Sequence, residues 1–323
     1  MEAARRNSLL RAGGWIVAAF VLWKVGASLA KGLGELRQQP LPIEPRWGYI
    51  ALSGAVFLIA HAVLIATWRT VLSCWDEHLP FWSAARVWSV SNLGRYVPGK
   101  IWQIGAMGAM ARDLNVSAVA ASGSALLGTL VNISAGFIVA LVSGRGLLLS
   151  RVAPGGRPFA IALVIAAGIS LLLLPFAIPR LAPLAGRIAR RPVQATLPVR
   201  AVVYSLVGNV LAWLVYGLAF EIFVAGVLGR ATGGYPTYLA AYTSSYLIGY
   251  IFLFAPAGVG FRETAMLELL QIAGLAAHPE AALVTLTSRI WLTLLEVVPA
   301  LLFWTHHRMR RRLTTIDRSD APS

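Results

Sequence analysis

Two short stretches of the chain place basic side chains beside proline and glycine within apolar surroundings. They read Asn92-Leu93-Gly94-Arg95-Tyr96-Val97-Pro98-Gly99-Lys100 and Pro256-Ala257-Gly258-Val259-Gly260-Phe261-Arg262-Glu263. An arginine fork binds a phosphate through two parallel hydrogen bonds, and a lysine adds a point charge. Free backbone N–H groups at broken helix ends also favour anions. Arg95, Lys100 and Arg262 therefore predict a phosphate-binding site.

The polar and helix-breaking residues near these stretches divide into two expected groups. Arg289 and Glu296, seven positions apart on one helix face, are about 10 Å apart along the axis. We expect each to reach another segment, with Glu263 and Arg262 as natural partners. Substrate contacts are expected from Arg95, Lys100, Arg262, Glu263, Asn92 and Tyr246, and structural or coupling roles from Pro98, Gly99, Pro256, Gly258, Gly260, Arg289 and Glu296.

Other interpretations of these residues stay open. Arg262 would be a structural brace if it paired with a carboxylate. Glu263 or Glu296 would carry a coupling proton, because burial favours the neutral form of a carboxylate. A stripe of tyrosines recurs every fourth residue and either packs between helices or lines a polar groove. Its members are Tyr238, Tyr242, Tyr246 and Tyr250.

Signatures of catalysis are missing from the sequence. It has no Gly-x-Ser-x-Gly elbow, no metal-spaced His or Cys, and no paired-aspartate motif for sugar-phosphate transfer. His61 stands alone in its apolar segment, which favours a structural role. Because Cys74 is the one cysteine, an internal disulfide is excluded. We expect no metal and no cofactor, and binding or transport more than catalysis.

The composition indicates the environment in which these residues lie. Of 323 residues, 58% are hydrophobic and 13% charged, with a mean hydropathy of +0.70. An ordinary soluble domain is about half apolar and a quarter charged, and a disordered chain is poorer still in apolar residues. The net charge of +15 comes from arginines that punctuate apolar runs, which is typical of membrane topology signals. The chain is therefore predicted to be a polytopic membrane protein that binds no nucleic acid.

Apolar stretches define the helices that position the two motifs. A helix needs about 20 apolar residues to cross roughly 30 Å of hydrocarbon. The first stretch, 12–30, has an alternative as a cleaved signal peptide ending at Ser28-Leu29-Ala30, although Lys24 argues for a retained helix. Full spans are expected at 12–30, 49–68, 117–142, 158–178, 201–228 and 281–304.

Loop charges orient these spans. Lys and Arg gather on the cytoplasmic side, which places both termini and the arginine-rich loop 180–200 in the cytoplasm, and 31–48 and 229–236 outside. The loop 143–157 then also faces outside. Two segments remain, 81–112 and 237–275, and each must enter and leave on one side.

The expected fold is an all-α polytopic membrane protein with about six full spans and two re-entrant hairpins, or eight or more helices. Spans and hairpins recur in the same order with opposite orientation, an inverted-topology repeat in which paired Gly/Pro breaks mark a transporter's binding site. Simple loops between short helices are the alternative to re-entrant hairpins. One membrane domain is expected over 1–310, with halves at about 12–142 and 158–304, and a basic, disordered cytoplasmic tail over 311–323.

With both motifs in place, the chain resembles the lysylphosphatidylglycerol synthase transmembrane-region family, which includes the flippase-like membrane half of the multiple peptide resistance factor. The two stretches quoted above carry the resemblance, and it extends over about residues 10–305. Ser288-Arg289 and Leu295-Glu296-Val297-Val298-Pro299 also fit. The resemblance implies a domain that moves an amphipathic lipid between leaflets, and we expect it to lack the soluble aminoacyltransferase domain of some relatives.

The sequence thus favours a flippase-like translocase for an anionic or phosphate-bearing lipid in a bacterial plasma (inner) membrane. The stretch from Arg95 to Lys100 departs from the more glycine-rich, acidic version of many relatives, so the resemblance does not identify the lipid. Two alternatives are a membrane enzyme acting on a lipid phosphate and an accessory subunit of a separate lipid-modifying enzyme.

Overall fold

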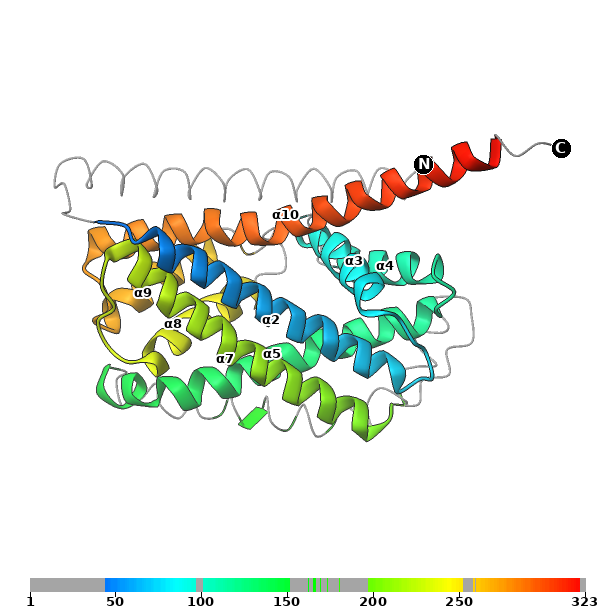
Figure 1. Cartoon of the computed structure of the whole chain (residues 1–323). Coiled ribbons are helices and arrows are strands. Elements are labelled where there is room, and N and C mark those ends of the chain that lie inside the picture. The colour runs from blue at the N-terminus through cyan, green and yellow to red at the C-terminus, as the bar shows by residue number, and fades with distance from the viewer. Residues whose placement is uncertain are drawn as a thin grey trace, which may run out of the picture.

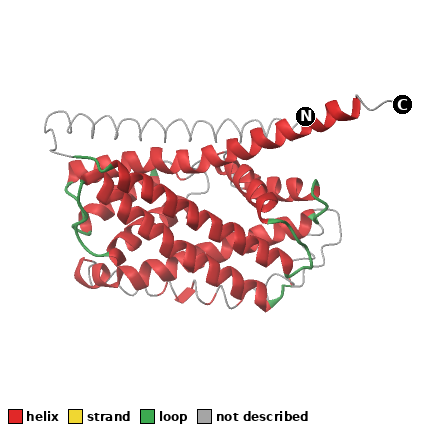
Figure 2. Cartoon of the chain, in the orientation of Figure 1, coloured by secondary structure: helices red, strands yellow, loops and turns green. Residues whose placement is uncertain are grey.

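The computed structural model describes residues 44–96, 101–151, 197–251, Gly258 and 260–319, with single positions between 162 and 180. All regular structure in this part of the chain is helical (Figures 1 and 2). The helices are α2 (Trp47–Ser73), α3 (Phe81–Asn92), η1 (Leu93–Tyr96), α4 (Ile101–Arg112), α5 (Ala118–Arg151), α7 (Val199–Leu228), α8 (Tyr235–Ile251), α9 (Phe261–Ile272) and α10 (His278–Ser319).

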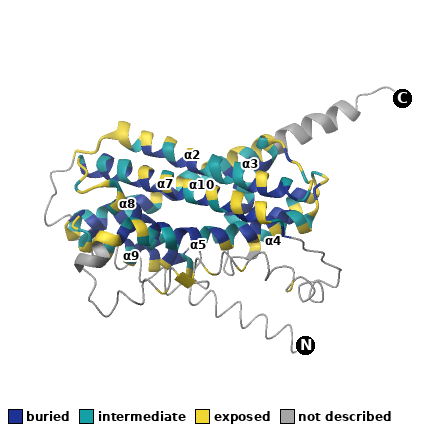
Figure 3. Ribbon diagram, turned by 90° about the horizontal axis from the view of Figure 1, so that it is seen from below, coloured by how far each residue is buried: buried dark blue, intermediate teal, exposed yellow. Residues whose placement is uncertain are grey.

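Within the described residues, four helices are long and apolar enough to cross a membrane. The segments that meet this condition are Trp47–Ser73, Ala118–Gly146, Val199–Leu228 and His278–His306. Exposed residues recur along the outside of these helices (Figure 3), and they include large apolar side chains such as Ile59, Leu211 and Ile290. Apolar surface on this scale is typical of a lipid-facing protein. The expected all-α membrane class is confirmed at this level.

Helices α2 and α7 form the most extensive helix pair in the described fold. They run antiparallel, because Gly208 lies against Thr67 whereas Gly226 lies against Ile50. A Cβ atom at Gly208 would lie 1.9 Å from Thr67 Oγ1, so the contact requires glycine. Small residues of this kind let membrane helices approach closely and pack without a hydrophobic driving force.

One end of the bundle, here called the Arg46 end, is defined by contacts between α2, α7 and α10. The Arg46 N–H donates to the Gly226 carbonyl oxygen at 2.8 Å. Arg230, just past α7, forms an ion pair with Glu280 in the first turn of α10 at 2.6 Å. Helix α2 therefore begins where α7 ends and where α10 begins.

The other end, here called the Cys74 end, joins α2 to α5 and α7. Arg200 Nη2 in the first turn of α7 donates to the Cys74 carbonyl oxygen at 3.3 Å. The Ser117 N–H, just before α5, donates to Glu77 Oε1 at 3.0 Å. Helices α2 and α10 thus run from the Arg46 end to the Cys74 end, and α5 and α7 run back.

Two pairs of shorter helices enter the bundle from opposite ends. Helices α3 and α4 start and finish at the Cys74 end. There the Trp82 ring packs near the Phe303 ring, late in α10, with 6.4 Å between the ring centroids. Helices α8 and α9 start and finish at the Arg46 end, where Thr232 Oγ1 donates to the Leu275 carbonyl at 2.7 Å. At 12 residues, α3, α4 and α9 are each about 18 Å long, too short to cross a membrane alone.

The described helices run in two opposite directions along the bundle. Helix α2 runs opposite to α7, α5 opposite to α10, and the α3–α4 pair enters from the end opposite to the α8–α9 pair. The expected segment 81–112 coincides with α3, η1 and α4. The expected span 12–30 lies outside the described residues, and so does nearly all of 158–178.

Two boundaries differ from the sequence-based expectation. The loop expected over 143–157 begins later, because α5 continues to Arg151. The tail expected to be disordered from 311 is helical as far as Ser319, because α10 continues through its arginines. Both extensions contain residues with high helix propensity, Leu in α5 and Arg in α10. A boundary drawn from hydropathy alone does not take helix propensity into account.

Candidate functional site

A cavity of about 90 Å³ lies in the middle of the bundle, where the two pairs of shorter helices meet. Its lining includes His61, Asn132, Trp213 and Glu296, and each lies within a few residues of the centre of a long apolar helix. A cavity of this size holds several water molecules or a small polar group. The site therefore lies midway between the Arg46 end and the Cys74 end.

A second cavity of about 50 Å³ adjoins the first. It extends between η1, the end of α8, the start of α9 and the middle of α10, with Arg289 and Thr293 on its wall. The residues that line both cavities form their common wall, and they are Arg95, Gln103, Tyr246, Tyr250, Arg262 and Glu296.

Arg95 is held by a carboxylate and an amide. Its Nη1 donates to Glu296 Oε1 at 2.6 Å, and its Nη2 donates to Asn92 Oδ1 at 2.9 Å. The Tyr96 hydroxyl donates to the second carboxylate oxygen of Glu296 at 2.9 Å. The Glu296 side chain is 9% exposed, so this is a charge pair removed from bulk solvent. The expected partner of Glu296 was Arg262, whereas the structure gives it Arg95.

Arg262 presents an uncompensated positive charge to the same cavities. Only 8% of the residue is exposed, and no ion pair links it to a carboxylate of the described chain. Its guanidinium lies over the rings of Tyr242 and Tyr246, at 5.4 and 5.2 Å from their centroids, which supplies cation–π stabilisation. Its Nη2 is buried without a hydrogen-bond partner. A buried donor of this kind is costly unless a ligand or a water molecule accepts a hydrogen bond from it.

Glu263, next to Arg262, is used for structure. Its Oε2 accepts the Gly260 N–H at 2.6 Å, which caps the start of α9. Its Oε1 lies 3.4 Å from Arg289 Nη1, forming an ion pair. Arg289 therefore has the partner expected from the sequence. The free N–H groups expected at the broken helix end are reduced by this cap, so Arg262 and not the helix terminus is the principal anion-binding feature here.

Glycines allow the tips of the shorter helices to come together. Gly258 and Gly260 have φ of 69° and 91°, a backbone region that favours glycine. A Cβ atom at Gly258 would lie 2.6 Å from the Gly249 carbonyl oxygen, and one at Gly94 would lie 2.8 Å from the Gln103 backbone nitrogen. The expected structural roles of Gly258 and Gly260 thus have a geometric basis.

The opposite wall of the larger cavity is uncharged. Asn132 Nδ2 donates to Asn209 Oδ1 at 2.7 Å, and Trp213 Nε1 donates to the Asn132 carbonyl at 3.1 Å. His61 Nδ1 lies 3.1 Å from the Tyr216 hydroxyl. Sequence reasoning gave His61 a structural role and did not select Asn132 or Asn209, although an asparagine at the centre of an apolar span is itself a signal of a buried polar contact.

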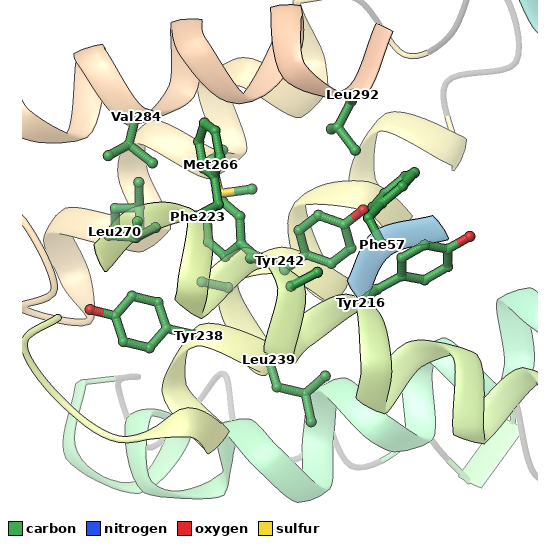
Figure 4. Close-up of a cluster of buried hydrophobic side chains, with 14 of the residues drawn as sticks. Phe57, Tyr216, Phe223, Tyr238, Leu239, Tyr242, Met266, Leu270, Val284 and Leu292 are labelled. Carbon is green, nitrogen blue, oxygen red and sulfur yellow. The ribbon is translucent and has the colours of Figure 1, made fainter. Parts of the chain in front are cut away.

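The tyrosine stripe serves both of the roles left open by the sequence. Tyr238 is fully buried in the hydrophobic core, and Tyr242 packs beside Tyr216, with 6.1 Å between ring centroids (Figure 4). Tyr246 and Tyr250 line both cavities. The stripe therefore changes from helix packing near the Arg46 end to cavity lining near the middle of the bundle.

The structure brings together most of the expected site residues that it describes. Asn92, Arg95, Arg262 and Tyr246 line the larger cavity, together with Glu296. Glu263 and Arg289 lie beside them and brace α9 against α10. Lys100, Pro98, Gly99 and Pro256 lie outside the described residues, so their expected roles remain predictions.

Comparison of the chain with protein-family models and with curated protein sequences gives no match. The lipid-translocase hypothesis therefore depends on the residues and geometry of this chain. What the cavity provides chemically is a stacked guanidinium with one unsatisfied nitrogen, Arg262 Nη2, beside the Arg95 guanidinium that Glu296 neutralises, with amides and phenols around them. This arrangement is suited to holding an anionic group inside a membrane.

Proposed function

We propose that the chain is a flippase-like transporter of an anionic or phosphate-bearing membrane lipid, with Arg262 as the main headgroup contact. The observation that carries this proposal is the buried guanidinium with an unsatisfied Nη2 in a cavity midway along four apolar helices. Ionisable groups inside membrane segments are costly and usually serve a substrate or ion pathway. A phosphate oxygen would accept a hydrogen bond from Arg262 Nη2, and its negative charge would neutralise the guanidinium.

The arrangement of the shorter helices supports transport over simple binding. We infer that α3–α4 and α8–α9 are re-entrant hairpins of an inverted repeat, because each pair starts and finishes at one end of the bundle. Described residues next to the turn of each pair, Arg95 and Gln103 in one and Tyr250 and Arg262 in the other, line the cavity, so movement of either pair would open the site toward one membrane face. Alternating access in inverted-repeat transporters works in this manner. We place the chain in a bacterial plasma membrane, with both termini cytoplasmic.

The test is transport of a fluorescent anionic phospholipid by purified protein in liposomes, measured as the fraction of probe accessible to a membrane-impermeant quencher. Arg262→Gln should reduce the transport rate by at least about tenfold, as loss of a charge-assisted hydrogen bond implies. The matched control is Arg230→Gln, which removes a surface arginine paired with Glu280 and should leave the rate unchanged.

Folding must be separated from transport in this experiment. Arg262→Lys keeps the charge but not the planar fork that stacks on the tyrosines, so it should retain partial activity. Both variants are accepted only if their melting temperatures match the wild type. Full transport by a folded Arg262→Gln protein would refute the assignment, and protein-independent flipping would refute the transport function.

A further inference from the structure

The charges around the two cavities indicate which anionic headgroup they accept. Among the described lining residues, the cations are Arg95, Arg262 and Arg289, and Glu296 is the carboxylate. Glu296 neutralises Arg95 at 2.6 Å, and Glu263 neutralises Arg289 at 3.4 Å. Arg262 is left as the one unmatched charge of this described set. A ligand with a single negative charge would therefore neutralise the net charge of this described set of residues.

The hydrogen bonds of Arg95 explain why this guanidinium is not readily shared with a ligand. Its two terminal nitrogens are engaged by Glu296 and Asn92, and Tyr96 holds the remaining carboxylate oxygen. A ligand that took over Arg95 would leave the Glu296 carboxylate buried without its cation. Removing one partner from a buried ion pair is strongly unfavourable. A second negative charge on the ligand thus competes with Glu296.

Building on the proposed function, we propose that Glu296 is a specificity residue that restricts the site to monoanionic phosphodiesters. With Glu296 charged, Arg262 binds one phosphodiester oxygen and Arg95 stays occupied. Phosphomonoesters carry up to two negative charges near neutral pH, and their second charge meets the Glu296 carboxylate instead of a free cation. Neutralising Glu296 releases Arg95 as a second cation and reverses this preference.

The experiment compares two lipids that differ by one methyl group. Dioleoyl phosphatidylmethanol is a monoanionic phosphodiester, and dioleoyl phosphatidic acid becomes a dianion above its second ionisation. Equal amounts of both are added to purified protein in an uncharged maltoside detergent at pH 8.5, and the bound lipids are quantified by native mass spectrometry. Wild-type protein should bind mainly phosphatidylmethanol.

Glu296→Gln should shift the bound ratio toward phosphatidic acid by at least about tenfold, the value expected for gaining one charge-assisted hydrogen bond. Glutamine has nearly the same shape and keeps one side-chain oxygen that accepts from Arg95, while its NH2 group takes the place of the oxygen that accepts from Tyr96 and can donate to the Tyr96 hydroxyl oxygen. Glu296→Asp keeps the charge and should preserve the wild-type preference. Glu280→Gln removes a carboxylate with an equally short ion pair at the Arg46 end and should not change the ratio.

Two outcomes separate this inference from the function on which it depends. If lipid binding requires Arg262 but the ratio is the same in wild type and Glu296→Gln, the selection role of Glu296 is wrong and the anion site stands. If neither lipid binds in an Arg262-dependent way, the proposed function fails.

A final arm identifies the source of the phosphate ester. Dimethyl phosphate and methyl phosphate are the water-soluble counterparts of the two headgroups, and each is titrated against bound lipid. Displacement only at concentrations far above those of the lipids supports a membrane lipid as the ligand. Tight binding of the soluble esters with the same charge preference, and no binding of lipid, supports the selection rule but overturns the lipid assignment.

Discussion

At the scale of single residues, α10 connects both pairs of shorter helices through charges of opposite sign. Glu296 holds Arg95 of η1, and Arg289 holds Glu263 of α9. Because the two α10 residues are about two turns apart, Glu296 pairs with η1 and Arg289 pairs with α9. The Arg289–Glu263 pair has the geometry of a brace, since Glu263 also caps the start of α9 at Gly260.

Arg289→Gln and Glu263→Gln should each destabilise the protein, and the double variant should lose less than the sum. Each single change leaves a mostly buried charge without its partner, which costs about 3–5 kcal/mol in fully buried pairs. Glutamine at 263 still accepts the Gly260 N–H, so the cap is preserved and the cycle isolates the ion pair. The measurement is the free energy of unfolding in a denaturing-detergent titration, with an expected coupling of about 1–3 kcal/mol. Additive losses would show that the two charges do not interact.

At the scale of helices, the sequence predicted the elements better than their contacts. Segment 81–112 was delimited as a stretch left between the predicted spans once loop charges had oriented them, and its Gly/Pro break is a local signal in the sequence. The pairing of Arg95 with Glu296 spans 201 positions and depends on how η1 meets α10, which no local pattern specifies. Asn132 and Asn209 carried a local signal, a polar residue within an apolar span, but their pairing depends on how α5 packs against α7.

The α2–α7 interface provides a test of packing at this scale. Gly208→Ala should destabilise the protein by about 1–3 kcal/mol, the usual cost of overpacking, because the added Cβ would lie within 3.0 Å of three Thr67 atoms. Gly123→Ala in α5 is the matched control, since nothing lies within 4 Å of its added Cβ. This control should be neutral or stabilising by up to about 1 kcal/mol, because alanine favours a helix. Melting temperatures in detergent compare the two, and equal effects would contradict the close α2–α7 approach.

At the scale of the whole molecule, two ends and a central cavity account for the proposed transport. The long helices provide an apolar exterior with exposed Leu and Ile, and the shorter pairs bring polar groups to the middle from opposite ends. Apolar segments and loop charges predict much of this layout from sequence. The assembly of the cavity from Arg262, Glu296 and the α5–α7 asparagines depends on tertiary packing and was not predictable in that way.

The arrangement of the two ends predicts which exposed loop residues share a membrane face. His78 and Asp113 are exposed near the Glu77–Ser117 contact at the Cys74 end, and Ala231 and Ala277 are exposed at the Arg46 end. Arg200 joins the Cys74 end and closes the arginine-rich loop that we place in the cytoplasm. Single cysteines at 78 and 113 should therefore be labelled only from the cytoplasmic side, and those at 231 and 277 only from outside.

The labelling is done with an impermeant maleimide in a Cys74→Ser background. Because Cys74 is buried in α2–α5–α7 packing, its replacement could affect folding, and the Cys74→Ser protein without added cysteines serves as the folding control. Labelling of all four positions from the faces opposite to those expected would show that the orientation in the membrane is reversed, and it would still agree with the described fold. Labelling of 78 and 113 from different faces would contradict the described fold, because the two loops meet through the Glu77–Ser117 hydrogen bond. The expected two-against-two pattern requires the α3–α4 pair to return to the face it enters, as the proposed re-entrant hairpin does.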